Sequence, residues 1–366
     1  MALILTFLGK GGTGRTTIAI AAAKKFASLG SKVLLASKDS SPALGVLLGN
    51  NPGSDPTEIA ANLSAVQLNS TTFLEKGWEQ VKDLEAEYLR SPLLKNVYGQ
   101  ELGILPGMDA AVALNAIREY DKSNKYDVII YDGSGDLATL RMLGVPEVMS
   151  WYIRRFRQVF LESDLGKAIS PFVQPFTSAI LNISISPDDI TDNEATKRSR
   201  EILDEGKAAI ANPKRFAAFL VTTEDPAAIA TAKYLWASAQ QVNVTVGGVI
   251  LNQSELNEDI NQDFSPLEVT SVPVRVGDDW QPLLDALPNF RSASQAPQPI
   301  NIDIPGRQVK VFLPKLDKKQ VKLTQYGTEI TIEAGDQRRN IILPPPLEGR
   351  SVKGAKFQEG YLIISL

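Results

Sequence analysis

The stretch Leu5–Ala23, LTFLGKGGTGRTTIAIAAA, places a glycine-rich loop between two apolar segments of different character. The segment before the loop, Ala2–Leu8, is a short unbroken apolar run, which is typical of a strand buried on both faces. The segment after the loop is rich in alanine and ends at Gly30, so it predicts a helix. A strand, a glycine loop and a helix in this order are the elements that cradle nucleotide phosphates.

Within the loop, the spacing Gly9-x-x-x-x-Gly14-Arg15-Thr16 matches the phosphate-binding pattern, except that arginine stands at the lysine position. Glycines let backbone N–H groups converge on phosphate oxygens, and Thr16 lies where a Mg²⁺-binding hydroxyl is expected. The alternative is a glycine-rich turn that binds no ligand. The residues predicted to bind nucleotide here are Gly9, Gly11, Gly12, Thr13, Gly14, Arg15, Thr16 and Thr17.

The composition is that of a globular chain: 366 residues, of which 43% are hydrophobic and 22% charged. A net charge of −4 argues against a general attraction to nucleic acid or anionic membranes. We expect no signal peptide and no integral membrane segment, because Met1 leads directly into the first apolar run and no run is long enough to span a bilayer. The expected location is the cytoplasm or an equivalent soluble compartment such as stroma.

The chain contains no cysteine and no histidine. Disulfides, thiolate zinc sites, imidazole bases and histidine-bound metals are therefore excluded. Chemistry has to use carboxylates, hydroxyls, Lys, Arg, backbone amides and oxygen-bound metals such as Mg²⁺.

Further apolar runs alternate with helical patterns, which predicts an α/β fold with a doubly wound, mostly parallel sheet. The additional strands are expected in Lys32–Ser37, Tyr126–Asp136, Phe216–Glu224 and Val246–Gln253. We expect this domain to span residues 1–290, with a helical subdomain at about 140–213. A linker rich in Ser, Pro, Gln and Asn is expected at 291–305, and short alternating strands predict a small all-β sandwich at 306–366.

The sequence GKGGTGRTT (residues 9–17) resembles the deviant phosphate loop of a large ATPase class. This class includes partition and septum-site ATPases, the nitrogenase iron protein, arsenical-pump ATPases and the guided-entry ATPases that target tail-anchored membrane proteins. In the class, the early lysine, matched by Lys10, reaches across a dimer interface to the partner's nucleotide. The resemblance therefore implies a homodimer that uses ATP and Mg²⁺. Arg15 departs from the family pattern: it keeps the charge but is larger than lysine and forks onto phosphate.

Two further segments resemble the switches of the guided-entry and arsenical-pump branches. In SKDSSPAL (37–44), Asp39 matches the aspartate that orients the attacking water, and a turn or helix-cap role is the alternative. In YDVIIYDGSGDLATLRML (126–143), Asp132 closes an apolar strand where a second-shell Mg²⁺ carboxylate is expected. The offset of Thr139–Leu143 from this aspartate favours these branches over the partition ATPases, although the family's intervening Pro-Thr-Gly-His is replaced by residues 135–138.

The resemblance continues to about residue 290. Asn252 in ILNQ matches the residue that reads adenine, and a turn role is the alternative. The segment Val272–Asp279 corresponds to a loop that flanks adenine, and Glu224 to a residue near the nucleotide or the dimer face.

The absence of cysteine also bears on the family's functions. It excludes the pump's cysteine-bound metalloid site and the Cys-x-x-Cys zinc clasp of the eukaryotic targeting factor, so no zinc is expected. The targeting family's client groove is rich in methionine, whereas this chain has 4 Met. The helical segment instead offers aromatic residues and the basic run IRRFR (153–157), which either line a client or partner surface or belong to an ordinary packed and solvated helix. The aromatic residues are Trp151, Tyr152, Phe156, Phe160, Phe172 and Phe176.

The C-terminal segment 327–366 resembles the core of the α-crystallin (small heat-shock) domain. The matching features are the alternating strand Glu329–Ala334, the pair Leu343-Pro344, Ala355 and the closing Gly360–Leu362. Such a domain serves either as a chaperone-like binding surface or as a structural cap.

These observations predict a homodimeric, Mg²⁺-dependent ATPase whose nucleotide state controls a hydrophobic surface for client proteins. One rival is a nucleotide-bound scaffold with little or no turnover. Another is a partition-type ATPase on DNA or membrane, against which the acidic net charge and the second switch argue. No nucleic-acid partner is expected.

Overall fold

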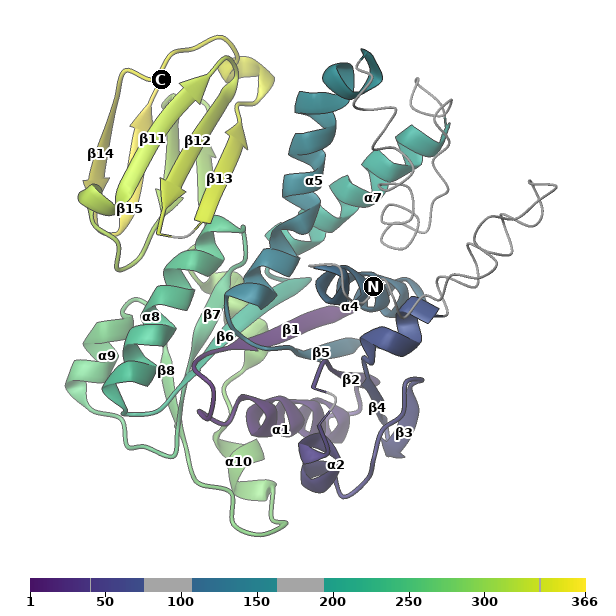
Figure 1. Ribbon diagram of the computed structural model, residues 1–366. Coiled ribbons are helices and arrows are strands. Elements are labelled where there is room, and N and C mark those ends of the chain that lie inside the picture. Colours follow the sequence, from purple (N-terminus) through teal and green to yellow (C-terminus); the bar gives the residue numbers. More distant parts are fainter. Residues whose placement is uncertain (40, 76–106, 163–193, 336) are drawn as a thin grey trace, which may run out of the picture. The chain divides into compact units, whose positions relative to one another are not determined.

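The computed structural model describes residues 1–39, 41–75, 107–162, 194–335 and 337–366 (Figure 1). The chain divides into two compact units, each made of segments that are distant in sequence. The first unit contains residues 1–2, 26–133 and 142–209, and the second contains 3–25, 134–141 and 210–366.

The first unit is built on strands in the order β3-β4-β2-β5. Strand β2 pairs in parallel with β4 and β5, whereas β3 is antiparallel to β4. Every residue of β2 and β5 is buried, as expected for apolar runs covered on both faces. The strands are β2 (Val33–Ser37), β3 (Thr57–Ala60), β4 (Leu63–Gln67) and β5 (Val128–Asp132).

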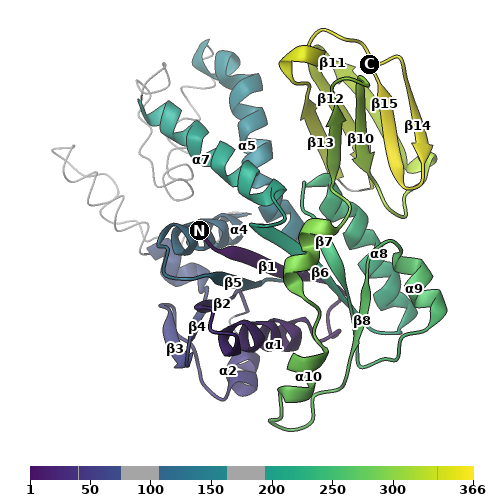
Figure 2. The same ribbon diagram turned by 180° about the vertical axis from the view of Figure 1, so that it is seen from behind.

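Helices α2 (Ala43–Leu48) and α4 (Met108–Lys122) also belong to this unit, as do most of α5 (Leu137–Glu162) and α7 (Glu194–Ala211). A side chain at Gly206 of α7 would lie 3.3 Å from the ring of Pro146 in α5, and the Lys207 ammonium donates to the Ser150 hydroxyl at 3.0 Å. The two helices therefore pack side by side, as both views show (Figures 1 and 2). They occupy the described part of the segment expected to form a helical subdomain.

The α/β part of the second unit has strands in the order β1-β6-β7-β8, all parallel. The predicted mostly parallel sheet with helices is thus confirmed. The strands are β1 (Leu3–Leu8), β6 (Phe216–Thr222), β7 (Val246–Asn252) and β8 (Val269–Val272). The helices are α1 (Arg15–Ser28, up to Lys25 in this unit), α8 (Pro226–Gln241), α9 (Glu258–Phe264) and α10 (Gln281–Ala286).

The C-terminal part of the second unit consists of a four-stranded and a three-stranded antiparallel sheet, which confirms the predicted all-β domain. Alternate residues of both sheets form one apolar core that includes Val309, Val311, Ile330, Ile332 and Ile364. The first sheet has the order β14-β15-β10-β9 and the second the order β11-β12-β13. Their strands are β9 (Ile300–Asp303), β10 (Gln308–Phe312), β11 (Val321–Tyr326), β12 (Glu329–Ala334), β13 (Gln337–Ile342), β14 (Gly354–Gln358) and β15 (Tyr361–Ser365).

Strand β9 lies inside the stretch 291–305 that the composition marked as a linker. It is preceded by the 3₁₀ helix η4 (Phe290–Gln295), and two more 3₁₀ turns, η5 (Lys318–Gln320) and η6 (Pro345–Leu347), lie in the β domain.

The β domain is joined to the C-terminal end of α8. The buried guanidinium of Arg339 donates to the carbonyl of Gln240 at 2.9 Å and to the side-chain oxygen of Asn243 at 2.7 Å. A cation that bonds the last carbonyls of a helix also complements the helix dipole. The rings of Trp236 and Phe312 meet edge to face with centroids 5.8 Å apart, so the joint combines apolar packing with a charged anchor. Among the described residues, no helix has both the length and the apolar character that a membrane crossing requires.

Candidate nucleotide-binding site

The glycine loop, residues 9–14, connects β1 to α1 in the second unit. Three contacts define its inner side. A side chain at Gly9 would collide with the carbonyl oxygen of Val221, and one at Gly14 with the amide of Asn252. The N–H of Gly9 donates to the carbonyl of Gly135 at 2.9 Å.

The outer side of the loop is open. A Cβ at Gly11 or Gly12 would meet no heavy atom within 4 Å. Gly12 and Gly14 have φ values of +86° and +87°, a conformation that residues with side chains rarely adopt. Contacts on the inner side of the loop therefore fix its conformation, whereas the backbone at Gly11 and Gly12 is accessible on the outer side.

A short turn sets the direction of the loop. The buried Thr13 hydroxyl donates to the carbonyl of Lys10 at 2.9 Å, whereas the Lys10 side chain itself is exposed. Helix α1 then begins at Arg15, with the half-buried Thr16 and Thr17 in its first turn and no acidic residue there. A helix start without a carboxylate keeps its N–H groups and dipole available to an anion.

These features fit the triphosphate of a nucleotide. The accessible backbone of Gly11 and Gly12 could supply N–H donors, and the hydroxyl of Thr16 is an oxygen ligand of the type that Mg²⁺ prefers. Among the described residues, no cluster of three or more acidic side chains forms a separate metal site.

Asn252, predicted to read adenine, lies at the end of β7 and is 2% exposed. Its side-chain nitrogen donates to the carbonyl of Thr13 at 2.8 Å. The structure therefore brings Asn252 to the inner side of the glycine loop, where it supports the backbone. Its contact with adenine stays a prediction.

Arg15, predicted to contact phosphate, bonds the segment Ser134–Asp136 in this structure. Its guanidinium donates to the carbonyl of Ser134 and lies so close to Gly135 that a side chain there would collide with it. The sequence analysis assigned no role to Ser134–Asp136 or to their bonds with the loop.

The side chain of Asp136 caps the start of α5. It accepts hydrogen bonds from the Ser134 hydroxyl at 2.6 Å and from the N–H of Ala138 at 2.9 Å. Burial raises the pKa of the Asp136 carboxyl, but the bonds from Ser134, Ala138 and Thr139 and the charge of Arg15 outweigh it, so that its pKa lies below the ordinary value. An aspartate directly before a helix is a common cap, and this was the signal available in the sequence.

Asp132 lies at the end of β5 in the first unit, as predicted, and is 4% exposed. The hydroxyl of Ser37, its register partner on β2, donates to its carboxylate at 3.2 Å. Ser37 is a second residue to which the sequence analysis assigned no role. The hydrogen bond joins the buried carboxylate at the end of β5 to the end of the adjacent parallel strand β2.

Asp39 follows β2 in the same unit and is exposed. Its two carboxylate oxygens accept from the N–H of Ser41 at 2.8 Å and from the Ser41 hydroxyl at 2.9 Å. The amide of Gln67 donates to the Asp39 carbonyl at 2.7 Å. These are the contacts of a turn residue, and they also hold the carboxylate in one orientation. Its role toward water stays a prediction.

Two other predicted segments lie next to strand ends in the second unit: Glu224 after β6, and residues 272–279 after β8. The N–H of Glu224 donates to the Ser254 hydroxyl at 3.0 Å, just before α8. After β8, two cations lie over the ring of Trp280: Lys24 Nζ is 5.3 Å and Arg275 Cζ is 4.8 Å from the ring centroid. These cation–π contacts were not predicted from the sequence.

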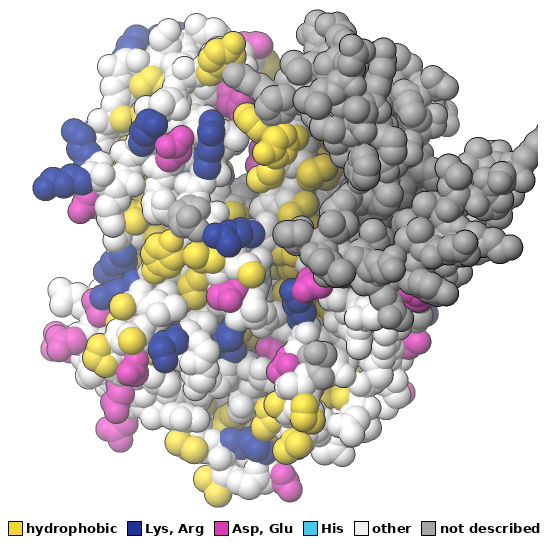
Figure 3. All heavy atoms as spheres, in the orientation of Figure 1, with side chains coloured by type: hydrophobic (Ala, Val, Ile, Leu, Met, Phe, Trp, Pro, Cys, Tyr) yellow, Lys and Arg dark blue, Asp and Glu magenta, His cyan; other side chains and the backbone are white. Residues whose placement is uncertain are grey.

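The aromatic residues of the helical segment are only partly described. The rings of Trp151 and Tyr152 meet edge to face at 5.1 Å, and Tyr152 is 50% exposed. The other four named aromatics, Phe156, Phe160, Phe172 and Phe176, lie outside the residues whose side chains are described. In Figure 3, hydrophobic side chains on the described surface form small groups separated by charged and polar ones.

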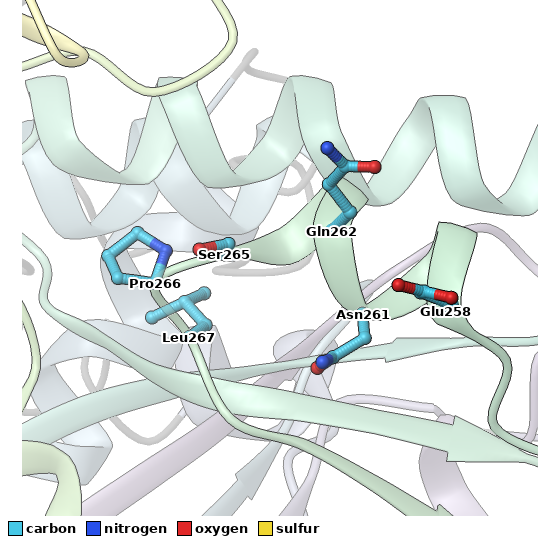
Figure 4. Close-up of a pocket in the computed structure, with 6 residues that line it drawn as sticks. All are labelled: Glu258, Asn261, Gln262, Ser265, Pro266 and Leu267. Carbon is cyan, nitrogen blue, oxygen red and sulfur yellow. The ribbon is translucent and has the colours of Figure 1, made fainter.

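A surface hollow formed by α9 and the loop after it is lined by none of the predicted site residues (Figure 4). Its lining is mostly polar and consists of Glu258, Asn261, Gln262, Ser265, Pro266 and Leu267.

Comparison with known proteins identifies both parts of the chain. The family model described as "Anion-transporting ATPase" matches residues 2–271, and the model "HSP20-like domain found in ArsA" matches residues 305–366. The second match supports the α-crystallin-like character of the C-terminal domain.

Similar full-length proteins are found in bacteria. The chain is 25% identical over 388 residues to a "Putative arsenical pump-driving ATPase" of Chlorobaculum tepidum, covering 99% of this chain and 95% of the relative. It is 25% identical over 403 residues to "Putative arsenical pump-driving ATPase 1" of Aquifex aeolicus, covering 99% of each. A fungal protein, "ATPase GET3" of Malassezia globosa, is 30% identical over 173 residues, or 46% of this chain and 48% of the relative. The chain belongs to the family of anion-transporting ATPases, and within it to the proteins that carry a C-terminal HSP20-like domain.

Proposed function

We propose that this chain is a Mg²⁺-dependent ATPase that works as a homodimer and whose nucleotide state controls a hydrophobic surface for client proteins. The observation that carries the proposal is the glycine loop, which is closed on its inner side by Val221 and Asn252 and open at Gly11 and Gly12. A loop built this way presents main-chain donors outward and is backed by a rigid sheet.

The residues have separate roles in this proposal. The backbone amides from Gly11 to Thr16 would hold the phosphates, and the Thr16 hydroxyl would hold Mg²⁺. The metal, when bound, neutralises charge on the phosphates. Asp132, oriented by the Ser37 hydroxyl, would accept hydrogen bonds from the metal's water shell.

Asp39 would position the attacking water. Both of its carboxylate oxygens are held by Ser41, so the carboxylate is oriented before water arrives. Such preorganisation lowers the reorganisation needed during the reaction.

Lys10 would act in the partner's site. Its carbonyl is engaged by Thr13 while its side chain is exposed, which supports a cation that projects away from its own loop. Light scattering with ATP and Mg²⁺ tests this role. A dimer in the wild type that is weakened in Lys10→Ala supports it, and a wild-type monomer at saturating ATP contradicts it.

The proposal is tested by nucleotide binding and steady-state ATP hydrolysis in the wild type, Asp39→Asn and Arg15→Lys. We expect Asp39→Asn to bind ATP with nearly unchanged affinity and to lose about 100-fold or more in turnover, as for removal of a group that acts mainly in the transition state. Arg15→Lys restores the family's residue and should still bind and hydrolyse ATP.

A second candidate is a nucleotide-bound scaffold with little turnover. The bonds of Asp39 to Ser41 and of Arg15 to Ser134 favour it, because a side chain predicted to be catalytic and one predicted to bind phosphate both have partners within the chain. Saturable ATP binding combined with turnover that does not depend on Asp39 would establish the scaffold and rule out the enzyme.

For the C-terminal domain we propose a structural role, because Arg339 and Phe312 are committed to the joint with α8. The client surface is then expected on the helical segment that carries Trp151 and Tyr152. The names of its bacterial relatives mention an arsenical pump, but this chain has no cysteine, so we do not propose that it binds an arsenical through thiolates.

A further inference from the structure

We propose that Arg15 is a positioning residue that latches the segment Ser134–Asp136 to the glycine loop, and that nucleotide phosphates compete with this segment for the Arg15 guanidinium. The inference deepens the proposed function and rests on it for the identity of the competing anion.

Two adjacent carbonyls form the latch. The Arg15 guanidinium donates to the carbonyl of Ser134, and the N–H of Gly9 donates to the carbonyl of Gly135 at 2.9 Å. Gly9 begins the glycine loop, and Arg15 is the first residue of α1 directly after the loop. Both residues are therefore tied to one short segment that lies 119 residues from Arg15 along the chain.

The shape of Gly135 suits the guanidinium. Gly135 has φ of +63°, and a side chain built on it would collide with the guanidinium of Arg15 and with the carbonyl of Phe7. The flat guanidinium thus lies directly against a backbone that has no Cβ. A lysine has a compact ammonium group in place of the planar guanidinium, so it cannot make this flat contact with the backbone.

The charge of Asp136 strengthens the latch. Its carboxylate is close enough to Arg15 for the cation to lower the pKa of the carboxyl, and it caps the first turn of α5 through Ala138. A carboxylate near Arg15 competes with phosphate for the guanidinium, because both are anions that attract the same positive charge. The wild-type affinity for nucleotide is therefore reduced by the free energy needed to free Arg15.

The consequence is a link between the loop and α5. When phosphates take Arg15, one of the two ties to Ser134–Asp136 is released, and the segment that starts α5 gains freedom. Arg15, which stands at the family's lysine position, then has two effects. It binds the phosphates, and it couples nucleotide binding to the conformation of the second switch segment.

The first test measures binding of ADP and of a non-hydrolysable ATP analogue with Mg²⁺ by titration calorimetry. Asp136→Asn keeps a good helix cap but removes the competing charge, so we expect a dissociation constant lower by about two- to fivefold, the range of an exposed ion pair. Asp317→Asn, which makes the same charge change at a cap in the β domain, should leave affinity unchanged. In the Arg15→Lys background the effect of Asp136→Asn should disappear. An unchanged or weaker affinity in Asp136→Asn overturns the latch.

The second test does not require nucleotide. Hydrogen exchange in the nucleotide-free protein should be faster in Arg15→Lys than in the wild type at Gly9 and at residues 135–139, where the N–H groups of Gly9, Gly135 and Ala138 are bonded. Equal exchange overturns the latch even if nucleotide binds. Failure of the wild type to bind either nucleotide overturns the proposed function instead, and faster exchange in the variant would still support the tie between Arg15 and Ser134.

Discussion

The glycine loop and the joint between α8 and the β domain use the same device for different ends. In each, a buried polar side chain donates to a distant main-chain carbonyl: Asn252 to Thr13 at 2.8 Å, and Arg339 to Gln240 at 2.9 Å. The joint is then closed by the rings of Trp236 and Phe312, whereas the loop stays open at Gly11 and Gly12. A hydrogen bond from a buried side chain to a main-chain carbonyl therefore supports close packing at the joint and an accessible backbone at the glycine loop. Substitutions at the joint should mainly change stability, and substitutions at the loop should mainly change binding.

The largest effect is expected at the joint. Arg339→Ala removes a buried cation that bonds Gln240 and Asn243 and leaves their oxygens without that donor, so we expect a loss of about 2–4 kcal/mol in the free energy of unfolding. Denaturant unfolding measures it. Arg338→Ala, at the exposed neighbouring position, should change stability by no more than about 0.5 kcal/mol. Equal losses in the two variants would show that Arg339 is not the anchor.

The next effect concerns the backbone of the loop. Gly14→Ala places a Cβ at φ of +87° and against Asn252, so we expect a strain of about 1–3 kcal/mol and at least tenfold weaker binding of ADP. Gly11→Ala has open space around its Cβ and should preserve the folded stability. Thermal unfolding and calorimetric titration of both variants measure the two quantities. A Gly14→Ala protein that binds ADP like the wild type would contradict the role of the loop.

Removal of the support behind the loop should have a smaller effect. Asn252→Ala leaves the Thr13 carbonyl without its donor, and we expect a loss of about 1 kcal/mol in unfolding free energy, with weaker nucleotide binding. Asn261→Ala, at an exposed position on α9, is the matched control and should change neither property. If Asn252 contacts adenine as predicted, the loss in affinity should be larger for ATP than for inorganic triphosphate. Equal losses for the two ligands would limit Asn252 to loop support.

The smallest effect is a pH dependence at the latch. The pKa of Asp136 in the folded protein lies below the ordinary value of 3.8, so its contribution to stability is present above that value and is lost as the pH falls through the folded pKa. Asp136→Asn should therefore flatten the dependence of the unfolding midpoint on pH below about pH 4. Parallel curves for the two proteins across this range would show that the carboxylate is not held by Arg15 and its hydrogen bonds.

Several elements were predictable because their signals are local. Five-residue apolar runs such as Val128–Asp132 became buried parallel strands, and period-two alternation in Glu329–Ala334 became a sandwich strand. Strands β3, β4, β8 and β9 were not predicted. Of these, β3 and β9 are short and only partly apolar, so that pairing with β4 and β10 rather than intrinsic preference stabilises them.

The site shows the same division. The position of Asp132 at a strand end followed from the sequence, because a polar residue after a buried apolar run marks the carboxyl end of a strand. Its partner Ser37 did not, because the register between β2 and β5 depends on the assembled sheet. Asp39 was predicted to be a switch residue by resemblance, but its bonds to Ser41 required the folded turn.

By itself, the sequence determined that a glycine loop lies between a buried strand and a helix, that thiol and imidazole chemistry is excluded, and that the C-terminal part of the chain is all β. These properties depend on composition and on patterns within about ten residues, which correspond to single elements. The tertiary structure alone decided what Arg15, Asn252 and Arg339 bond. Their partners lie 119, 239 and 99 residues away along the chain, and only the close packing of the folded protein brings such distant donors and acceptors within 3 Å.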